Sequence, residues 1–152
     1  MSAETQIANL LYRYAECMDS GDLAEAASLF EHARLRVGGT DRTIDATTML
    51  KFWKAAVLLH PDGTPRTKHL VTNPIIQVDD QAGTASCRSC FTVLQQADGF
   101  PLQTIVTGRY HDEFQRVGGS WRYSFRDFRL IDMVGDISRH LTRSITPIPR
   151  NV

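Results

Sequence analysis

The chain has 152 residues, a one-domain length that is long enough to bury a hydrophobic core. Hydrophobic residues make up 42% of it and charged residues 22%, and the 17 Lys and Arg residues balance 17 Asp and Glu residues. A formal net charge of zero argues against a broad basic surface, and therefore against binding to nucleic acid or to an anionic membrane. We expect a small ligand that is neutral or weakly charged.

The N-terminal residues lack the basic and apolar runs of a secretory signal, and no apolar stretch reaches the roughly 18 residues of a membrane span. Cys17, Cys87 and Cys90 form an odd set, which fits a reducing compartment, so we expect a cytoplasmic protein. Residues three apart on a strand point to opposite faces. The Cys87-x-x-Cys90 spacing therefore does not predict a redox or metal site.

Two helices are predicted at the start of the chain. Apolar residues recur at three- and four-residue intervals from Ile7 to Met18, which is typical of one buried helix face. Gly21 suits the end of this helix, and Asp22 suits the start of a second, short helix that ends near Phe30.

The next segment is predicted to be a hairpin followed by a third helix. Two short extended runs flank the Gly38-Gly39 turn. Asp45 can cap a helix from Ala46 to about Leu59, with Met49, Phe52 and Trp53 on its apolar stripe.

Strand signals fill the rest of the domain. Four runs rich in Val, Ile, Thr and aromatic residues are separated by short turns, at 66–79, 84–96, 100–117 and 120–134. The turns are too short for crossover helices, so neighbouring strands should be antiparallel.

Helices first and a strand meander after them predict an α+β protein. We expect a cone-shaped, barrel-like fold in which the N-terminal helices pack on a curved antiparallel sheet. Residues 1–140 should form one domain, and the polar, proline-bearing tail at 141–152 should be loosely ordered.

These residues resemble the nuclear-transport-factor-2-like superfamily, and its SnoaL-like branch most of all. The resemblance rests on Tyr14, on MDSGD at 18–22, on RTKH at 66–69 and on GRYHD at 108–112. It implies the cone-shaped fold and a homodimer formed through the open sheet face. It does not settle the reaction, because one fold carries many functions.

Scytalone dehydratase is the nearest enzyme pattern in that superfamily. Its motifs match Asp19-Ser20 and Arg66-Thr67-Lys68-His69. The resemblance implies that Asp19 orients His69, and that His69 acts as the general acid and base on a hydroxy-ketone. Tyr14 is then a hydrogen-bond donor to the substrate.

Two further enzymes of the superfamily match in part. Ketosteroid isomerase places its oxyanion tyrosine at Tyr14 but its catalytic base at about Gly38, which cannot abstract a proton. Limonene epoxide hydrolase bridges two carboxylates with an arginine, for which Arg88 is the candidate. Arg88 could orient a substrate or lie on an exposed strand face.

The predicted function is a cofactor-free, metal-free lyase or isomerase that acts on a neutral cyclic or aromatic hydroxylated compound. The candidate catalytic residues are Asp19 and His69. The candidate substrate-binding residues are Tyr14, Phe52, Trp53 and Arg88. The alternative is a non-catalytic binding or accessory module, such as the small subunit of a ring-hydroxylating dioxygenase.

Overall fold

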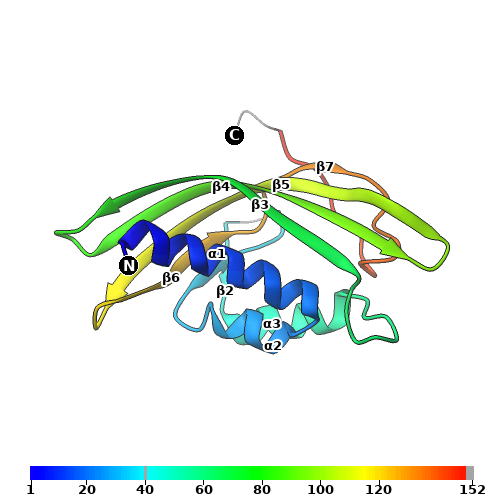
Figure 1. The fold of residues 1–152 in the computed structure, drawn as a ribbon, viewed down its shortest axis with the longest axis horizontal. Coiled ribbons are helices and arrows are strands. Elements are labelled where there is room, and N and C mark those ends of the chain that lie inside the picture. Colours follow the sequence, from blue (N-terminus) through cyan, green and yellow to red (C-terminus); the bar gives the residue numbers. More distant parts are fainter. Residues whose placement is uncertain (40, 150–152) are drawn as a thin grey trace.

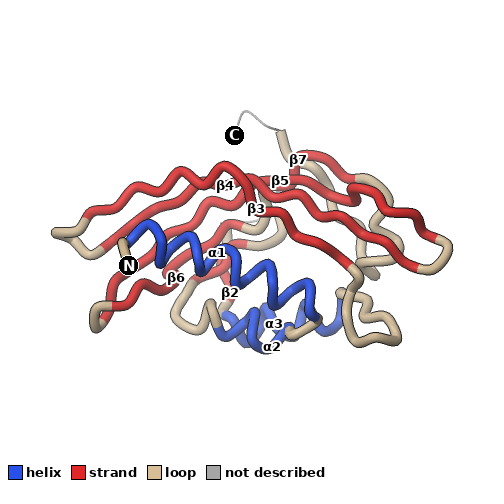
Figure 2. Tube along the Cα trace, in the orientation of Figure 1, coloured by secondary structure: helices blue, strands red, loops and turns tan. Residues whose placement is uncertain are grey.

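The protein is described from a computed structural model that places residues 1–39 and 41–149. Within these residues, three helices lie on the concave side of a curved seven-stranded sheet that arches over them (Figure 1). Figure 2 shows that the opposite face of the sheet carries no helix. The elements are α1 (Ala3–Ser20), α2 (Leu23–Ser28), β1 (Arg34–Arg36), β2 (Thr43–Ile44), α3 (Ala46–Ala56), β3 (Thr67–Asp79), β4 (Thr84–Ala97), β5 (Phe100–Val117), β6 (Ser120–Asp127) and β7 (Ile131–Val134).

The strand order is β2-β1-β6-β5-β4-β3, and β7 pairs with the first half of β5. The predicted antiparallel meander is confirmed for β3 to β6. The short strand β1 differs, because it runs parallel to β6. With β3 and β2 at its two edges the sheet is curved but not closed into a barrel, and the α+β architecture is confirmed.

Two predicted element boundaries are wrong. The third helix ends at Ala56 rather than near Leu59, because Val57 takes an extended backbone and pairs with Leu141. The predicted last strand is interrupted after Asp127, whose carboxylate accepts hydrogen bonds from the backbone and side chain of Arg129. The chain then turns, and β7 pairs with β5 instead of continuing β6.

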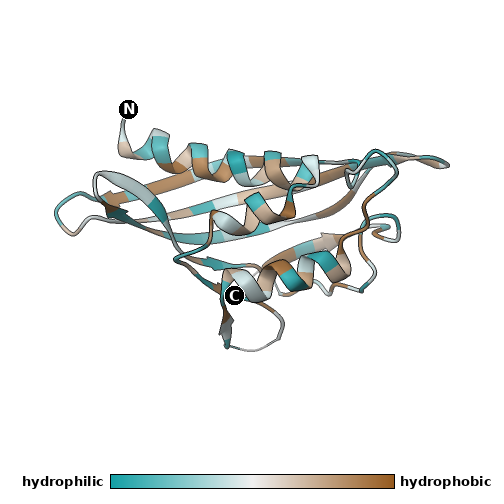
Figure 3. Cartoon of the chain, turned by 90° about the horizontal axis from the view of Figure 1, so that it is seen from below, coloured by the Kyte–Doolittle hydropathy of each residue, from teal (hydrophilic) through white to brown (hydrophobic). Residues whose placement is uncertain are grey.

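The core lies between the helices and the concave face of the sheet. Hydrophobic and hydrophilic residues alternate around α1 and α3 in Figure 3, so each helix turns one apolar face to the sheet. Buried residues also alternate along β4, where Cys87 is buried and Cys90 is exposed, as predicted for opposite strand faces.

The predicted tail reaches residues 150–152, which lie outside the described residues. Within the described part, the amide of Thr142 donates to the carbonyl of Ala56, and the amide of Ile148 donates to that of Ile131. No helix in the described ranges is long and apolar enough to span a membrane.

Candidate functional site

Asp19 and His69 meet where the end of α1 crosses the edge strand β3. Oδ1 of Asp19 lies 2.5 Å from Nδ1 of His69, and Oδ2 accepts the backbone amide of His69 at 2.8 Å. The hydroxyl of Thr67 donates to Oδ1 at 2.9 Å. One carboxylate is therefore fixed by three contacts to β3, and it cannot turn without breaking them.

The position of Asp19 follows from the helix end. Gly21 takes a left-handed conformation (φ 81°) and its amide closes on the carbonyls of the last turn. The turn lies against the loop before β3, since a Cβ on Gly21 would stand 2.2 Å from the carbonyl oxygen of Gly63. Asp22 then caps α2 by accepting the amide of Glu25, which leaves Asp19 for His69.

This arrangement sets the tautomer of the His69 ring. Because the carboxylate only accepts hydrogen bonds, Nδ1 carries the proton, and Nε2 of the neutral ring keeps its lone pair. None of the described residues gives Nε2 a hydrogen-bond partner. The side chain is only 6% exposed. His69 is therefore an oriented imidazole whose free nitrogen can accept a proton.

Tyr14 and Trp53, predicted as substrate-binding residues, lie in the interior near this pair. The ring of Tyr14 is edge-on to that of His69 at a centroid distance of 6.4 Å, and Trp53 lies 6.1 Å from Tyr14. Burial raises the pKa of Tyr14 to about 12, although the nearby Arg126 cation opposes the shift. Tyr14 thus keeps its proton at neutral pH and can only donate or share it.

Phe52 and Arg88, which were predicted as substrate-binding residues, do not lie beside the Asp19–His69 pair. Phe52 is 43% exposed on α3, one position away from the buried stripe that carries Trp53. Arg88 is exposed on the convex face of β4. His69 pairs with Val93 on the concave face, so Arg88 points away from it.

A surface crevice of about 400 Å³ runs between α1 and β3 beside the pair. Its lining includes Asp19, Ser20 and His69 together with Tyr12, Glu16 and Lys68. Among the described residues, no three His, Cys, Asp or Glu side chains gather in a way that could hold a metal ion.

A buried ion pair, which the sequence analysis did not predict, lies in the core of the domain. Arg126 and Asp112 are both fully buried and form two hydrogen bonds, Nε to Oδ1 at 2.6 Å and Nη2 to Oδ2 at 2.8 Å. The guanidinium carbon lies 3.9 Å from the ring centroid of Tyr110 and 4.6 Å from that of Tyr14. The Asp112 side chain points into the core, and both of its carboxylate oxygens bind Arg126 rather than a ligand.

His140 lies beside His69, although the sequence analysis did not predict it at the site. It comes from the segment after β7, yet its ring is edge-on to that of His69 at a centroid distance of 6.4 Å. It is 5% exposed, and its Nδ1 has no hydrogen-bond partner within the described ranges. His69 and His140 are far apart in the sequence and share no motif, so sequence analysis could not predict this contact.

The burial of His140 predicts an acid-sensitive fold. Burial, together with the neighbouring His69, lowers the pKa of His140 to about 4. In the unfolded chain, the histidine ring binds its proton with the ordinary pKa of about 6.5. Between pH 6.5 and pH 4 the unfolded chain therefore holds more protons than the folded protein, so the free energy of unfolding decreases as the pH is lowered through this range. We expect about 2 to 3 kcal/mol less unfolding free energy near pH 4.5 than near pH 7.5 from this group.

Urea denaturation at the two pH values measures the effect. His140→Leu should remove most of the difference, whereas His32→Leu, at an exposed histidine, should leave it in place. Equal pH dependence in wild type and His140→Leu would contradict the prediction.

Three helices pack on the concave face of a curved open sheet, and an oriented imidazole lies where α1 meets β3. This arrangement is that of a small α+β domain of the nuclear-transport-factor-2-like class. Within that class the chain belongs to the SnoaL-like domain family, whose model matches residues 1–127. No curated protein matches it.

Several solved structures share the fold. A candidate scytalone dehydratase from Novosphingobium aromaticivorans is 20% identical, with a TM-score of 0.69 over 97% of this chain and 93% of that one. Rv3472 from Mycobacterium tuberculosis, of unknown function, is 23% identical, with a TM-score of 0.67 over 86% and 72%. The beta subunit of a candidate aromatic-ring-hydroxylating dioxygenase from N. aromaticivorans is 17% identical, with a TM-score of 0.66 over 88% and 91%. At these identities the similarity shows the fold alone.

Proposed function

We propose that the chain is a cofactor-free enzyme that uses Asp19 and His69 for general acid–base chemistry on a neutral cyclic or aromatic hydroxy-ketone. The supporting observation is the 2.5 Å contact between Asp19 and Nδ1 of His69, which leaves Nε2 as the basic atom. An imidazole is suited to proton transfer near neutral pH, because its ordinary pKa lies close to that pH.

The proposed reaction begins with removal of a proton from the carbon next to the ketone. Nε2 of His69 takes this proton, and Asp19 stabilises the resulting imidazolium. In a dehydratase the imidazolium returns the proton to the β-hydroxyl group. One C–H bond and one C–O bond break, a carbon–carbon double bond forms, and water leaves. An isomerase would return the proton to another carbon instead.

Tyr14 is proposed to assist by donating a hydrogen bond to the substrate oxygen. Its raised pKa keeps the phenol protonated, so it stabilises negative charge without losing its own proton. Trp53, which packs against Tyr14, is proposed to contact the ring of the substrate.

Thermal melts of wild type and His69→Ala, with and without a panel of aromatic hydroxy-ketones and sterol-like compounds, test the binding part of the proposal. A compound that binds the folded state raises Tm by mass action, by an amount worth about 2.7 kcal/mol at a hundredfold excess over Kd. We expect a hydroxy-ketone to raise the Tm of the wild type, and the gain to shrink or disappear in His69→Ala. An equal gain in both proteins would place the ligand elsewhere.

The second candidate function is a non-catalytic accessory module. It is favoured by the tightly filled interior, in which the Tyr14 ring lies 5.6 to 6.4 Å from those of Phe30, Trp53, His69, Tyr110 and Phe128. A dioxygenase beta subunit shares the fold. Stable co-purification with a co-expressed large oxygenase subunit, without any ligand-induced rise in Tm, would favour this function.

We also propose that two copies pair through the convex sheet face. One cross-strand row on that face joins Leu70, Thr92, Thr107 and Met133, and its two large apolar side chains are exposed. Such a face is stabilised when a second copy covers it. Sedimentation should show a dimer for wild type and a monomer for the Leu70→Glu/Met133→Glu variant, whereas Leu59→Glu, at an exposed loop residue, should stay dimeric. A monomeric wild type would refute the pairing.

A cytoplasmic location is proposed on the chemistry of the cysteines. Cys17, Cys87 and Cys90 are all free thiols in the structure, which suits a reducing compartment.

A further inference from the structure

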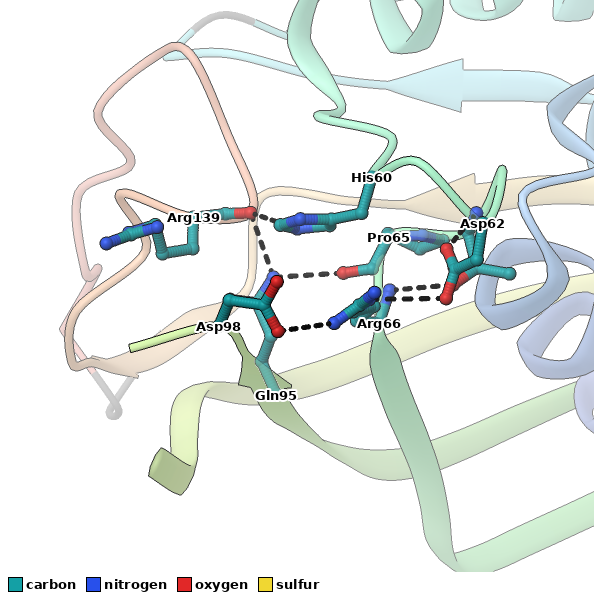
Figure 4. Close-up of polar contacts among 8 residues, drawn as sticks. His60, Asp62, Pro65, Arg66, Gln95, Asp98 and Arg139 are labelled. Atoms are coloured by element: carbon teal, nitrogen blue, oxygen red, sulfur yellow. Dashed lines mark hydrogen bonds and ion pairs between the residues drawn. The ribbon is translucent and has the colours of Figure 1, made fainter. Parts of the chain in front are cut away.

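A group of polar contacts holds the segment that carries His140 against the rest of the domain. The buried amide of Gln95 donates to the carbonyls of Pro65 and Arg139, each at 2.9 Å, and Nε2 of His60 lies 3.1 Å from the Arg139 carbonyl. Figure 4 shows these side chains converging on the Arg139 carbonyl. The backbone of residue 139 is thus fixed by two different elements, and the next residue is His140.

Further contacts fix the same segment and its support. The amide of Leu58 donates to the carbonyl of His140 at 2.8 Å. Beneath it, Arg66 bridges the carboxylates of Asp62 and Asp98 at 3.2 Å each, which holds the loop before β3 in place (Figure 4). The position of the His140 ring therefore results from backbone and side-chain bonds that do not involve the ring itself.

The His140 ring is left in an unusual state by this arrangement. Its Nδ1 is buried without a partner, which costs free energy because this atom has lost water and gained no hydrogen bond. The ring of His140 lies edge-on to that of His69, whose hydrogen bonds within the described residues are made by its backbone amide and by Nδ1. The centroids of the two rings are 6.4 Å apart at an interplanar angle of 71°, so a single ligand group can come within reach of both rings.

We propose that His140 is a second substrate-contacting residue of this site, and that His69 and His140 together bind one neutral hydroxyl group, which donates to Nε2 of His69 and accepts a hydrogen bond from His140. The inference rests on the proposed function, because it names the atom group that the Asp19–His69 pair would act on. His140 supplies a hydrogen bond and His69 moves the proton.

The charges around His140 define the ligand. The ionisable groups that influence it are His69 on β3, Asp19 on α1 and His60 in the loop after α3. An anionic ligand would lie close to the Asp19 carboxylate and meet no permanent cation among these groups. The pair therefore favours a neutral alcohol over a carboxylate or phosphate. His69 also lines the crevice between α1 and β3, from which a small ligand can approach its ring.

Nuclear magnetic resonance of isotope-labelled histidine rings tests the inference with two probes. β-Hydroxytetralone supplies a neutral cyclic hydroxy-ketone, and benzoate supplies an aromatic anion. We expect β-hydroxytetralone to shift the ring signals of both His69 and His140, with His32 unmoved, and benzoate to shift neither site histidine.

If only His69 responds, the role of His140 is refuted and the proposed function stands. If neither responds, both are refuted. If benzoate shifts the pair equally, the preference for a neutral oxygen is wrong.

A substitution separates a functional role from simple core filling. His140→Leu removes an unpartnered buried polar ring, so its Tm near neutral pH should equal or exceed that of the wild type. Its affinity for β-hydroxytetralone should fall by about tenfold, the effect of one lost hydrogen bond. His140→Gln retains a donor and should lie between the two, and it replaces His140→Leu if that protein does not fold. His32→Leu serves as the matched control. Unchanged affinity in the site variants would overturn the inference.

Discussion

An Asp112→Asn variant is expected to lose about 3 to 5 kcal/mol of unfolding free energy, because it leaves the Arg126 guanidinium buried without a counter-charge. Both side chains are fully buried, so water cannot replace the lost partner. Burial works against the charged guanidinium, but Asp112 and the neighbouring tyrosines outweigh it and hold the pKa of Arg126 above its ordinary value. A guanidinium does not lose its proton in the accessible pH range, so the cation persists in the variant even without Asp112.

Urea denaturation near neutral pH measures this loss. The matched control is Glu25→Gln, which removes the charge from a largely exposed pair with Arg13 and should cost far less than Asp112→Asn. A double variant, Asp112→Leu with Arg126→Met, removes both charges and should recover most of the stability. If Asp112→Asn loses no more unfolding free energy than Glu25→Gln, the buried pair contributes little to folding.

The size of this effect follows from the surroundings of the guanidinium. Five aromatic rings lie within 5.5 Å of its central carbon, those of Tyr14, Phe30, Tyr110, Tyr123 and Phe128. The Tyr123 hydroxyl accepts a third hydrogen bond at 3.1 Å. Cation–π contacts and these bonds compensate for desolvation in the native state, and only the carboxylate supplies a full opposite charge.

Much of the fold was predictable because its signals are local. The apolar stripe from Ile7 to Met18 and the capping residues Asp22 and Asp45 act within a few residues of themselves. The turns between long strands are short, which permits only antiparallel neighbours. The break after Asp127 was not predictable in the same way, because Phe128 to Leu130 have the composition of a strand and the interruption depends on a side-chain bond to Arg129.

The candidate site was predictable only where a motif marked it. Asp19 and His69 lie 50 positions apart, and the resemblance to a dehydratase pattern, rather than periodicity, brought them together. His140 belongs to no such motif, and its place depends on backbone bonds from Leu58 and Gln95. A weaker signal was present for the ion pair. Asp112 falls between Tyr110 and Phe114 on one strand face, and a carboxylate on an apolar face implies a buried partner.

An Asp19→Asn variant should fold normally yet lose turnover of β-hydroxytetralone by about 10² to 10⁴-fold, the usual contribution of a positioned acid–base group. The amide oxygen can still accept the backbone amide of His69, so the link between α1 and β3 survives. The amide nitrogen of the new asparagine, however, donates a hydrogen bond to Nδ1 of His69, whereas the carboxylate of Asp19 accepts one from it. The proton of the neutral ring then moves to Nε2, which can no longer act as the base.

Loss of water from β-hydroxytetralone yields a naphthol, whose appearance can be followed by fluorescence. The matched control is Asp22→Asn, an aspartate-to-asparagine change three residues away in a position that caps α2, where asparagine caps equally well. Asp22→Asn should therefore keep the wild-type rate, and His69→Ala should lose as much turnover as Asp19→Asn or more.

Because Asp19 and His69 act as one unit, the Asp19→Asn/His69→Ala double variant should be scarcely slower than His69→Ala. Additive losses in the double variant would mean that Asp19 acts independently of the His69 ring, and an inactive wild type would leave the accessory-module function as the better account of the fold.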